Sequence, residues 1–154
     1  YLDSTPQEVV SRTLAEVMAF NRTNAEKVMP HFAQEIFGLS EQTTASDEPR
    51  LDTLARQLKR LAGPEGIDAL LQQANCEILV APTFGRPWKI DLENGDNFEG
   101  SSCTTLPAVS GYPHLTVPMG LADGLPLGLS FIGTAFSEST LLAAGFAFEQ
   151  ARID

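Results

Sequence analysis

The chain has 154 residues, 43% of them hydrophobic, and ten basic against twenty acidic residues give a net charge of −10. This length and composition suffice for one core of ordinary size. The acidic balance argues against nucleic acid and against an anionic membrane surface as partners, because both are bound through basic residues. No apolar run approaches the roughly 18 residues of a membrane span, so we expect no membrane partner.

The two cysteines, Cys76 and Cys103, are too few for a disulfide scaffold. Cys76 precedes an apolar run, and we interpret it as a small buried hydrophobe rather than a reactive thiol. The sequence starts at Tyr1 with neither an initiator Met nor a basic-plus-apolar signal segment. We therefore expect it to be a portion of a longer protein.

The first 75 residues have mainly helical patterns. Thr5-Pro6-Gln7-Glu8 is typical of a helix start, because Thr5 and Glu8 can cap each other's backbone amides and Pro6 suits the first helical turn. Residues 31–39 and 51–61 are amphipathic at a helical period, and the run Gly63-Pro64-Glu65-Gly66 is expected to end the second helix. A short helix over 67–74 follows. The first helix would bury apolar residues that share one face: Val9, Val10, Leu14, Val17 and Met18.

Short apolar runs bounded by Gly and Pro predict three strands, at about 77–81, 114–118 and 126–133. The segment 137–151 predicts a closing helix that is apolar almost all round, which implies burial on more than one side. Helices, then strands, then a helix favour an α/β fold. We expect a single partial domain over 1–154, mainly helical over 1–75, with a strand-and-loop core over 76–133 that ends before the closing helix.

Gly100-Ser101-Ser102, beside Cys103, is the most prominent candidate for a nucleophile. A reactive serine needs a base to take its proton and donors to hold the oxyanion. No sequence pattern links His31 or His114 to these serines. We interpret the segment as a loop or a helix cap, with a chemical role for either serine as the alternative.

No metal or cofactor is expected. The acidic segment 91–99 lacks the ligand spacing and terminal glutamate of a calcium loop, so we interpret it as solvated. No glycine-rich run ends in Lys-Ser or Lys-Thr to cradle a phosphate. Of three lysines, only Lys89 lies in a strand-exit loop, and a surface role is favoured for it over a basic one. These residues do not assemble a complete catalytic set.

Four blocks carry a family pattern: Ala81-Pro82-Thr83, and the segments 109–113, 115–120 and 124–133. They resemble the C-terminal part of amidase signature family enzymes. Elsewhere, Phe20-Asn21, residues 29–35, and Trp88 to Asp91 with Gly95-Asp96 are similar to the bacterial branch that contains peptide amidases. The resemblance covers nearly the whole chain, and the strand-and-turn blocks are its specific part.

The resemblance implies an α/β fold whose mixed sheet, here of few strands, is packed by helices, and hydrolysis of carboxamide C–N bonds. It implies a Ser–cis-Ser–Lys triad that forms an acyl-enzyme, with backbone amides holding the oxyanion. Those elements belong to the N-terminal part of such enzymes, and this sequence has no Gly-Gly-Ser-Ser-Gly-Gly run. No catalytic residue is carried over, so the fragment alone is predicted to be inactive.

The resemblance does place a wall of the substrate pocket in the loop after the first strand, at Thr83, Phe84, Gly85 and Trp88. With the N-terminal part, these residues would grip a small amide or a peptide amide; their alternative role is loop packing on the core. The alternative function is a non-catalytic binding or assembly module that reuses the half-fold. A truncated enzyme half should expose a large apolar face that invites self-association, whereas an independent module should be monodisperse with protected sheet edges.

Overall fold

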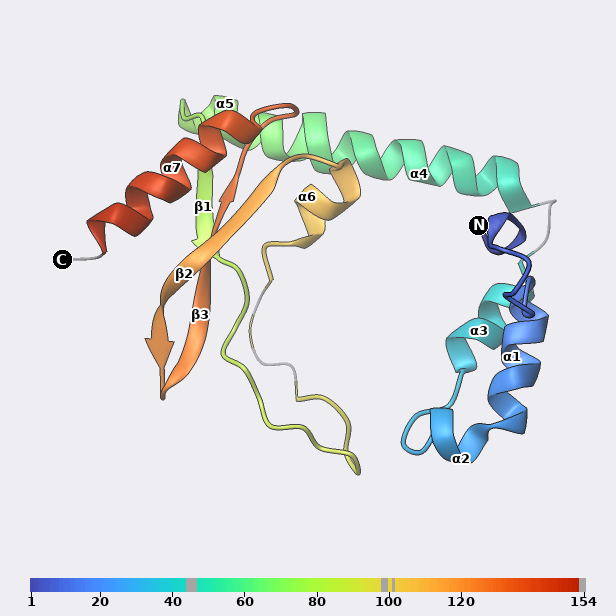
Figure 1. Cartoon of the computed structure of the whole chain (residues 1–154). Helices are drawn as coiled ribbons and strands as arrows, with labels where there is room; N and C mark the ends of the chain where they lie inside the picture. Colours follow the sequence, from blue (N-terminus) through green and yellow to red (C-terminus); the bar gives the residue numbers. More distant parts are fainter. Residues whose placement is uncertain (44–46, 98–99, 101, 153–154) are drawn as a thin grey trace. The chain divides into compact units, whose positions relative to one another are not determined.

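A computed structural model of the chain describes residues 1–43, 47–97, 100 and 102–152. Its contacts divide into two compact units, Tyr1–Leu51 and Asp52–Asp154, and the boundary falls inside the helix α4 (Glu48–Ala62) (Figure 1). The assignment of residues 1–154 to a single partial domain stays a prediction.

The first unit contains the 3-10 turn η1 (Leu2–Ser4) and the helices α1 (Leu14–Thr23), α2 (Ala25–Val28) and α3 (Glu35–Glu41). The prediction of a helix start at Thr5 was wrong. Thr13 forms the capping box instead: its Oγ1 accepts from the amide of Glu16 at 3.2 Å, and the Glu16 carboxylate accepts from the Thr13 amide at 3.0 Å. The guanidinium of Arg12 donates to the carbonyls of Thr5 and Pro6, so these carbonyls are bonded outside any helix.

Polar side chains join α1 to the segment that starts α3. The Asn21 side chain donates to Gln34 Oε1, and Gln34 Nε2 donates to the carbonyl of Met18, each at 3.1 Å. None of the described residues of this unit is buried.

The second unit opens with three helical segments in direct succession: α4, a π-helical segment η3 (Gly63–Asp68) and α5 (Ala69–Ala74). The expected stop at Gly63–Gly66 is therefore corrected, because the helix widens there and continues. The two glycines allow this. A Cβ at Gly63 would lie 3.0 Å from the Tyr112 ring, and one at Gly66 would lie 2.7 Å from the Leu61 carbonyl oxygen.

Three strands form the sheet: β1 (Leu79–Pro82), β2 (His114–Ala122) and β3 (Leu125–Ile132), in the order β1-β3-β2. The predicted α/β class and the three strands are confirmed. The expectation of a mixed sheet is corrected for this part of the fold, since both pairings are antiparallel. The two-residue turn Asp123-Gly124, with φ of 53° and 79°, forces β2 and β3 into a hairpin. β1 then pairs with the other edge of β3.

Two helices complete this unit: α6 (Thr105–Ser110), inside the long connection between β1 and β2, and α7 (Glu138–Ala151), which packs on β2 and β3 (Figure 1). Six of the buried apolar residues form two small clusters. One joins η3 and α5 to the sheet, and the other lies under α7; their members are Ile67, Leu71 and Ile132, and Val117, Phe131 and Leu141.

The helix α7 is buried on one face only in the described structure. Leu141 is 1% exposed, whereas Leu142 and Phe146 are 61% and 64% exposed. The expected burial on more than one side is therefore not met by the residues described. The expectation for Cys76 is likewise corrected: it follows the end of α5 and is exposed. None of the described helices is both long and apolar enough to span a bilayer.

Candidate functional site

Thr83 is the first residue after β1 and opens the long loop of the site. Its backbone amide donates to the carbonyl of Gly128 on β3 at 2.8 Å. Its carbonyl accepts from the backbone amide of Cys103 at 3.3 Å and from the Cys103 thiol at 3.6 Å. Thr83 and Cys103, which flank the loop of residues 84–102, are thus hydrogen-bonded to each other.

The hydroxyl of Thr83 belongs to a polar cluster on the sheet, which we call the hydroxyl–imidazole cluster: Thr83, His114, Thr116 and Ser130. Ser130 Oγ lies 2.7 Å from Thr83 Oγ1, 2.6 Å from His114 Nε2 and 3.4 Å from Thr116 Oγ1. The three strands bring these side chains together because Ser130 on β3 is the register partner of Thr116 on β2 and of Ala81 on β1.

Gly128 provides the space for this cluster. A Cβ at Gly128 would come within 2.7 Å of the Thr116 methyl group and 2.8 Å of Thr83 Oγ1. Any side chain at this position would push the two threonines away from Ser130. The cluster therefore depends on a glycine in the central strand, where glycine otherwise weakens a sheet.

Burial lowers the pKa of His114 below its usual 6.5. Desolvation penalises the charged imidazolium, so the neutral ring is favoured at pH 7. A neutral ring has one nitrogen free to accept a hydrogen bond. His114 can therefore serve as an acceptor for the Ser130 hydroxyl.

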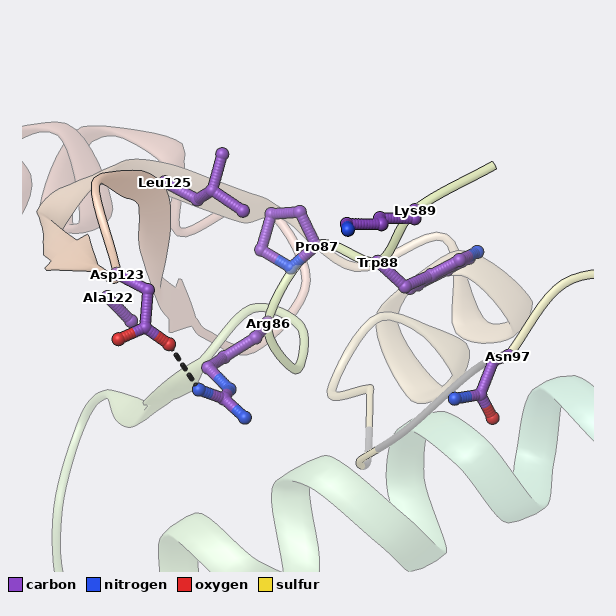
Figure 2. A pocket seen from close by; sticks show the side chains of 8 residues that line it. All are labelled: Arg86, Pro87, Trp88, Lys89, Asn97, Ala122, Asp123 and Leu125. Carbon is purple, nitrogen blue, oxygen red and sulfur yellow. Dashed lines mark hydrogen bonds and ion pairs between the residues drawn. The ribbon is translucent and has the colours of Figure 1, made fainter. Parts of the chain in front are cut away.

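A cavity of about 590 Å³ lies beyond the cluster, between the loop after β1 and the tip of the β2–β3 hairpin. Figure 2 shows the residues that line it from both sides, with an ion pair between the Arg86 guanidinium and the Asp123 carboxylate at 2.5 Å. Two aromatic or apolar surfaces, Trp88 and Leu125, and the ammonium group of Lys89 also face this space. The complete lining is Arg86, Pro87, Trp88, Lys89, Asn97, Ala122, Asp123 and Leu125.

The four residues predicted to line a pocket take different positions. Trp88 lines the cavity, and its indole N–H donates to Asp96 at 3.2 Å. Phe84 is 41% exposed. Gly85 approaches the other limb of the loop so closely that a Cβ on Gly100 would lie 3.1 Å from its Cα. Thr83 directs its hydroxyl to Ser130 and does not line the cavity.

The acidic segment folds on itself. Asp91 accepts from the amides of Glu93 and Asn94 and from the Asn94 side chain, and these bonds lower the pKa of its carboxyl group. Among the described residues, no group of three or more His, Cys, Asp or Glu could hold a metal ion.

Ser102 lies in the turn before α6, where its Oγ accepts from the amide of Thr104 at 3.2 Å and lies 2.7 Å from the Thr104 hydroxyl. These bonds form a local serine turn, which fits the loop interpretation; the N-cap of α6 is Thr104, and no described side chain caps this helix. Ser101 lies outside the described residues. Within the described ranges, no lysine is hydrogen-bonded to a serine.

No family model matches the chain. A probable amidase of Arabidopsis thaliana is 32% identical over 144 residues, which are 92% of this chain and 24% of that protein. A peptide amidase solved with the competitive inhibitor chymostatin has a TM-score of 0.87 and 44% identity over 94% of this chain and 29% of its own. A bacterial aryl acylamidase of the amidase signature family shares the fold at 21% identity and a TM-score of 0.53, covering 90% and 32%.

The chain matches the C-terminal part of amidase signature enzymes. The recognition made from the strand-and-turn blocks is thereby confirmed. The chain spans 24% of the Arabidopsis relative and 29% of the peptide amidase, so it corresponds to a minor part of either amidase signature protein.

Several residues of the site were not predicted from the sequence. The dipeptide Asp123-Gly124 between apolar runs is a hairpin signal that could have placed Asp123 at a tip beside the loop. His114 and Ser130 had no such signal. Their partnership follows from the register of β2 against β3, which is visible only in the folded sheet.

Proposed function

We propose that the chain is the C-terminal part of an amidase that hydrolyses the C–N bond of carboxamides and releases ammonia or an amine. The observation that carries this proposal is the 44% identity, at a TM-score of 0.87, to a peptide amidase over 94% of this chain. The substrate class is a small amide or a peptide amide, because that relative binds chymostatin as a competitive inhibitor.

The bond-breaking groups are a Ser–cis-Ser–Lys triad outside this chain. A neutral Lys takes a proton through the bridging Ser, the nucleophilic Ser attacks the amide carbon, and the amine leaves with a proton as the acyl-enzyme forms. Water then cleaves the ester and restores the serine. The sequence has no Gly-Gly-Ser-Ser-Gly-Gly run, so the chain alone is expected to be inactive.

In this proposal the present chain supplies a wall of the substrate pocket. Phe84, Gly85 and Trp88 lie in the loop after β1, and Thr83 fixes the start of that loop. The Trp88 ring and the cavity beside it offer an apolar surface with a few polar groups at its edge, which is the usual character of a ligand site.

The second candidate function is a non-catalytic binding or assembly module. The exposed apolar residues Leu142 and Phe146 on α7 are instead expected of an enzyme half, whose missing part would cover them. Sedimentation of the purified chain separates the two functions: self-association fits the enzyme half, and a single monodisperse species fits the independent module.

The test is ammonia release from simple amides and peptide amides, by the purified chain and by the full-length gene product. We expect turnover only by the full-length protein. A Trp88→Ala variant of that protein should have a raised KM.

One outcome would contradict the proposal directly. Turnover by the chain alone that is lost in the Ser101→Ala/Ser102→Ala double variant would mean that these serines form a self-contained nucleophilic site. Absence of turnover by the full-length protein over the whole panel would contradict the proposed activity.

A further inference from the structure

We propose that Ser130 and His114 are positioning residues that act through Thr83 to hold the loop of residues 84–89 at the cavity beside the hairpin tip. The positioning of the loop by these residues follows from hydrogen bonds of the sheet. The consequence for substrate binding rests on the proposed function.

Ser130 is the first ground for the proposal. It is fully buried on the central strand, with the apolar residues Phe131 and Ile132 next to it in sequence. A buried hydroxyl loses its bonds to water, and only new hydrogen bonds offset that cost. Ser130 recovers these bonds from two side chains of β2 and from Thr83 at the loop start, so its hydroxyl joins β3 to both segments.

Thr83 is the point at which this buried anchor reaches the loop. Its amide is fixed to Gly128, its carbonyl to Cys103, and its hydroxyl to Ser130. A residue held in three directions determines where the next residues start. Phe84 and Trp88 follow within five positions, too few for the chain to lose the direction that Thr83 imposes.

A second anchor, the Arg86–Asp123 ion pair, is far more exposed. Its side chains are 64% and 78% exposed, and such surface pairs contribute little because water and salt screen them. The bond between half-buried Thr83 and fully buried Ser130 is accordingly the stronger of the two anchors.

His114 sets the direction of the hydrogen bonds. Ser130 has one hydroxyl proton and three neighbouring acceptors or donors. With a neutral His114 accepting at Nε2, Ser130 donates to the imidazole and accepts the proton of Thr83. Thr83 is then a committed donor to the sheet, and its hydroxyl is held away from the cavity.

Trp88 is the only tryptophan of the chain and therefore reports directly on the loop. The measurements are acrylamide quenching of its fluorescence and the rate of tryptic cleavage after Lys89, both well below the unfolding temperature. Three variants of the 154-residue chain remove one partner each: Thr83→Val, which keeps the shape of the side chain, Ser130→Ala and His114→Asn. Thr83→Ser, which keeps the hydroxyl, is the rescue. Ser40→Ala, which removes a hydroxyl bonded only within α3, is the matched control.

We expect cleavage after Lys89 to become about fivefold faster in Thr83→Val and Ser130→Ala, the factor that loss of one buried hydrogen bond gives a local opening equilibrium. The Thr83→Val/Ser130→Ala double variant should be cleaved no faster than the more rapidly cleaved of the two single variants, because both substitutions remove the same hydrogen bond. Thr83→Ser and Ser40→Ala should match the wild type. If the variants melt earlier but leave quenching and cleavage unchanged, the cluster is merely structural and the proposal is overturned.

The same substitutions in the full-length protein test the catalytic consequence. We expect a severalfold rise of KM for peptide amides with kcat nearly unchanged. An unchanged KM alongside a loosened loop would overturn the link to substrate binding. A full-length protein without any amidase activity would overturn the proposed function alone, since the loop measurements decide the positioning role separately.

Discussion

The two units of the chain contain similar helical patterns but very different packing. Over the described ranges, the buried apolar residues belong to Asp52–Asp154, where Ile67 and Leu141 are each 1% exposed. In Tyr1–Leu51, Ile36 on α3 is 69% exposed, and Phe32, which precedes that helix, is 68% exposed. A helical period therefore did not predict burial, which required a sheet for the helices to pack against.

The forces that hold the two units differ accordingly. The first is held by local polar contacts: a capping box at Thr13 and the bonds of Asn21 and Gln34. The second combines apolar clusters on both sides of a sheet with a buried hydroxyl at its centre. Substitutions of the same chemical kind should consequently have unequal effects in the two units.

The largest difference is expected for truncation of an apolar side chain. Leu141→Ala removes a fully buried side chain packed on Val117 and Phe131, and should lower the free energy of unfolding by about 3 kcal/mol. Ile36→Ala should change it by less than about 0.5 kcal/mol, because that side chain is already solvated. Urea denaturation of both variants measures the contrast, and equal losses would show that the first unit has a core of its own.

Replacing a helical glycine with alanine should lower the free energy of unfolding in the second unit and raise it in the first. A Cβ at Gly145 in α7 would lie 2.5 Å from Leu115 and 3.3 Å from Val117, so Gly145→Ala should destabilise by about 1–2 kcal/mol. Gly38 in α3 has no atom within 4 Å of that position. Gly38→Ala should stabilise its helix by up to about 1 kcal/mol. Unfolding midpoints of the two variants that shift in the same direction would contradict this prediction.

Loss of the helix cap should be a local effect. Thr13→Ala removes the acceptor of the Glu16 amide and should cost about 1 kcal/mol. Because none of the first unit's described residues is buried, hydrogen exchange should quicken in α1 and stay unchanged in β3. Thr13→Ser is the conservative control. Faster exchange throughout the sheet would mean that the two units unfold as one.

The smallest effect concerns pH and is confined to the second unit. The pKa of His114 is lowered in the folded chain, so below pH 6.5 the unfolded chain binds more protons than the folded one. The free energy of unfolding should fall as pH decreases from 6.5 to about 5, above the range in which Glu16 and Asp91 titrate. Unfolding at several pH values measures this slope, which should vanish in His114→Asn.

Much of the second unit could be predicted from the sequence because its strands are short apolar runs bounded by Gly and Pro. The three predicted strands match β1, β2 and β3 to within a few residues, except that β2 extends to Ala122. The extension passes through an irregularity between Pro118 and Gly120, where Pro118 had suggested an end. An edge strand tolerates a proline, so this signal for a strand end was misleading.

The errors in the helical part have a common physical origin. Thr5 to Glu8 and Thr13 to Glu16 both carry a Thr three residues before a Glu, and only contacts outside the motif decide between them. Arg12 decides by binding the carbonyls of Thr5 and Pro6. At Gly63–Gly66, the packing of Tyr112 against the bare glycine permits a wider helical turn where composition predicted a stop.

The candidate site was predictable only where it is local in sequence. The family resemblance assigned Trp88 to a wall of the substrate pocket; Trp88 lines the cavity beside the hairpin tip, and its contact with substrate stays a prediction. The opposite wall at Asp123 and the anchor at Ser130 come from the hairpin, which is distant in sequence. Side chains that meet through sheet register leave no short motif.

The two-residue turn at Asp123-Gly124 has a consequence for the order of folding. Strands joined by so tight a turn meet after a short search, and the β2–β3 hairpin can form early. β1 must close the long connection through α6 before it can pair with β3. Thr83 directly follows β1, the strand that pairs last. During refolding, His114 should therefore reach Ser130 first, and the amide of Thr83 should become protected from hydrogen exchange only in the slower step.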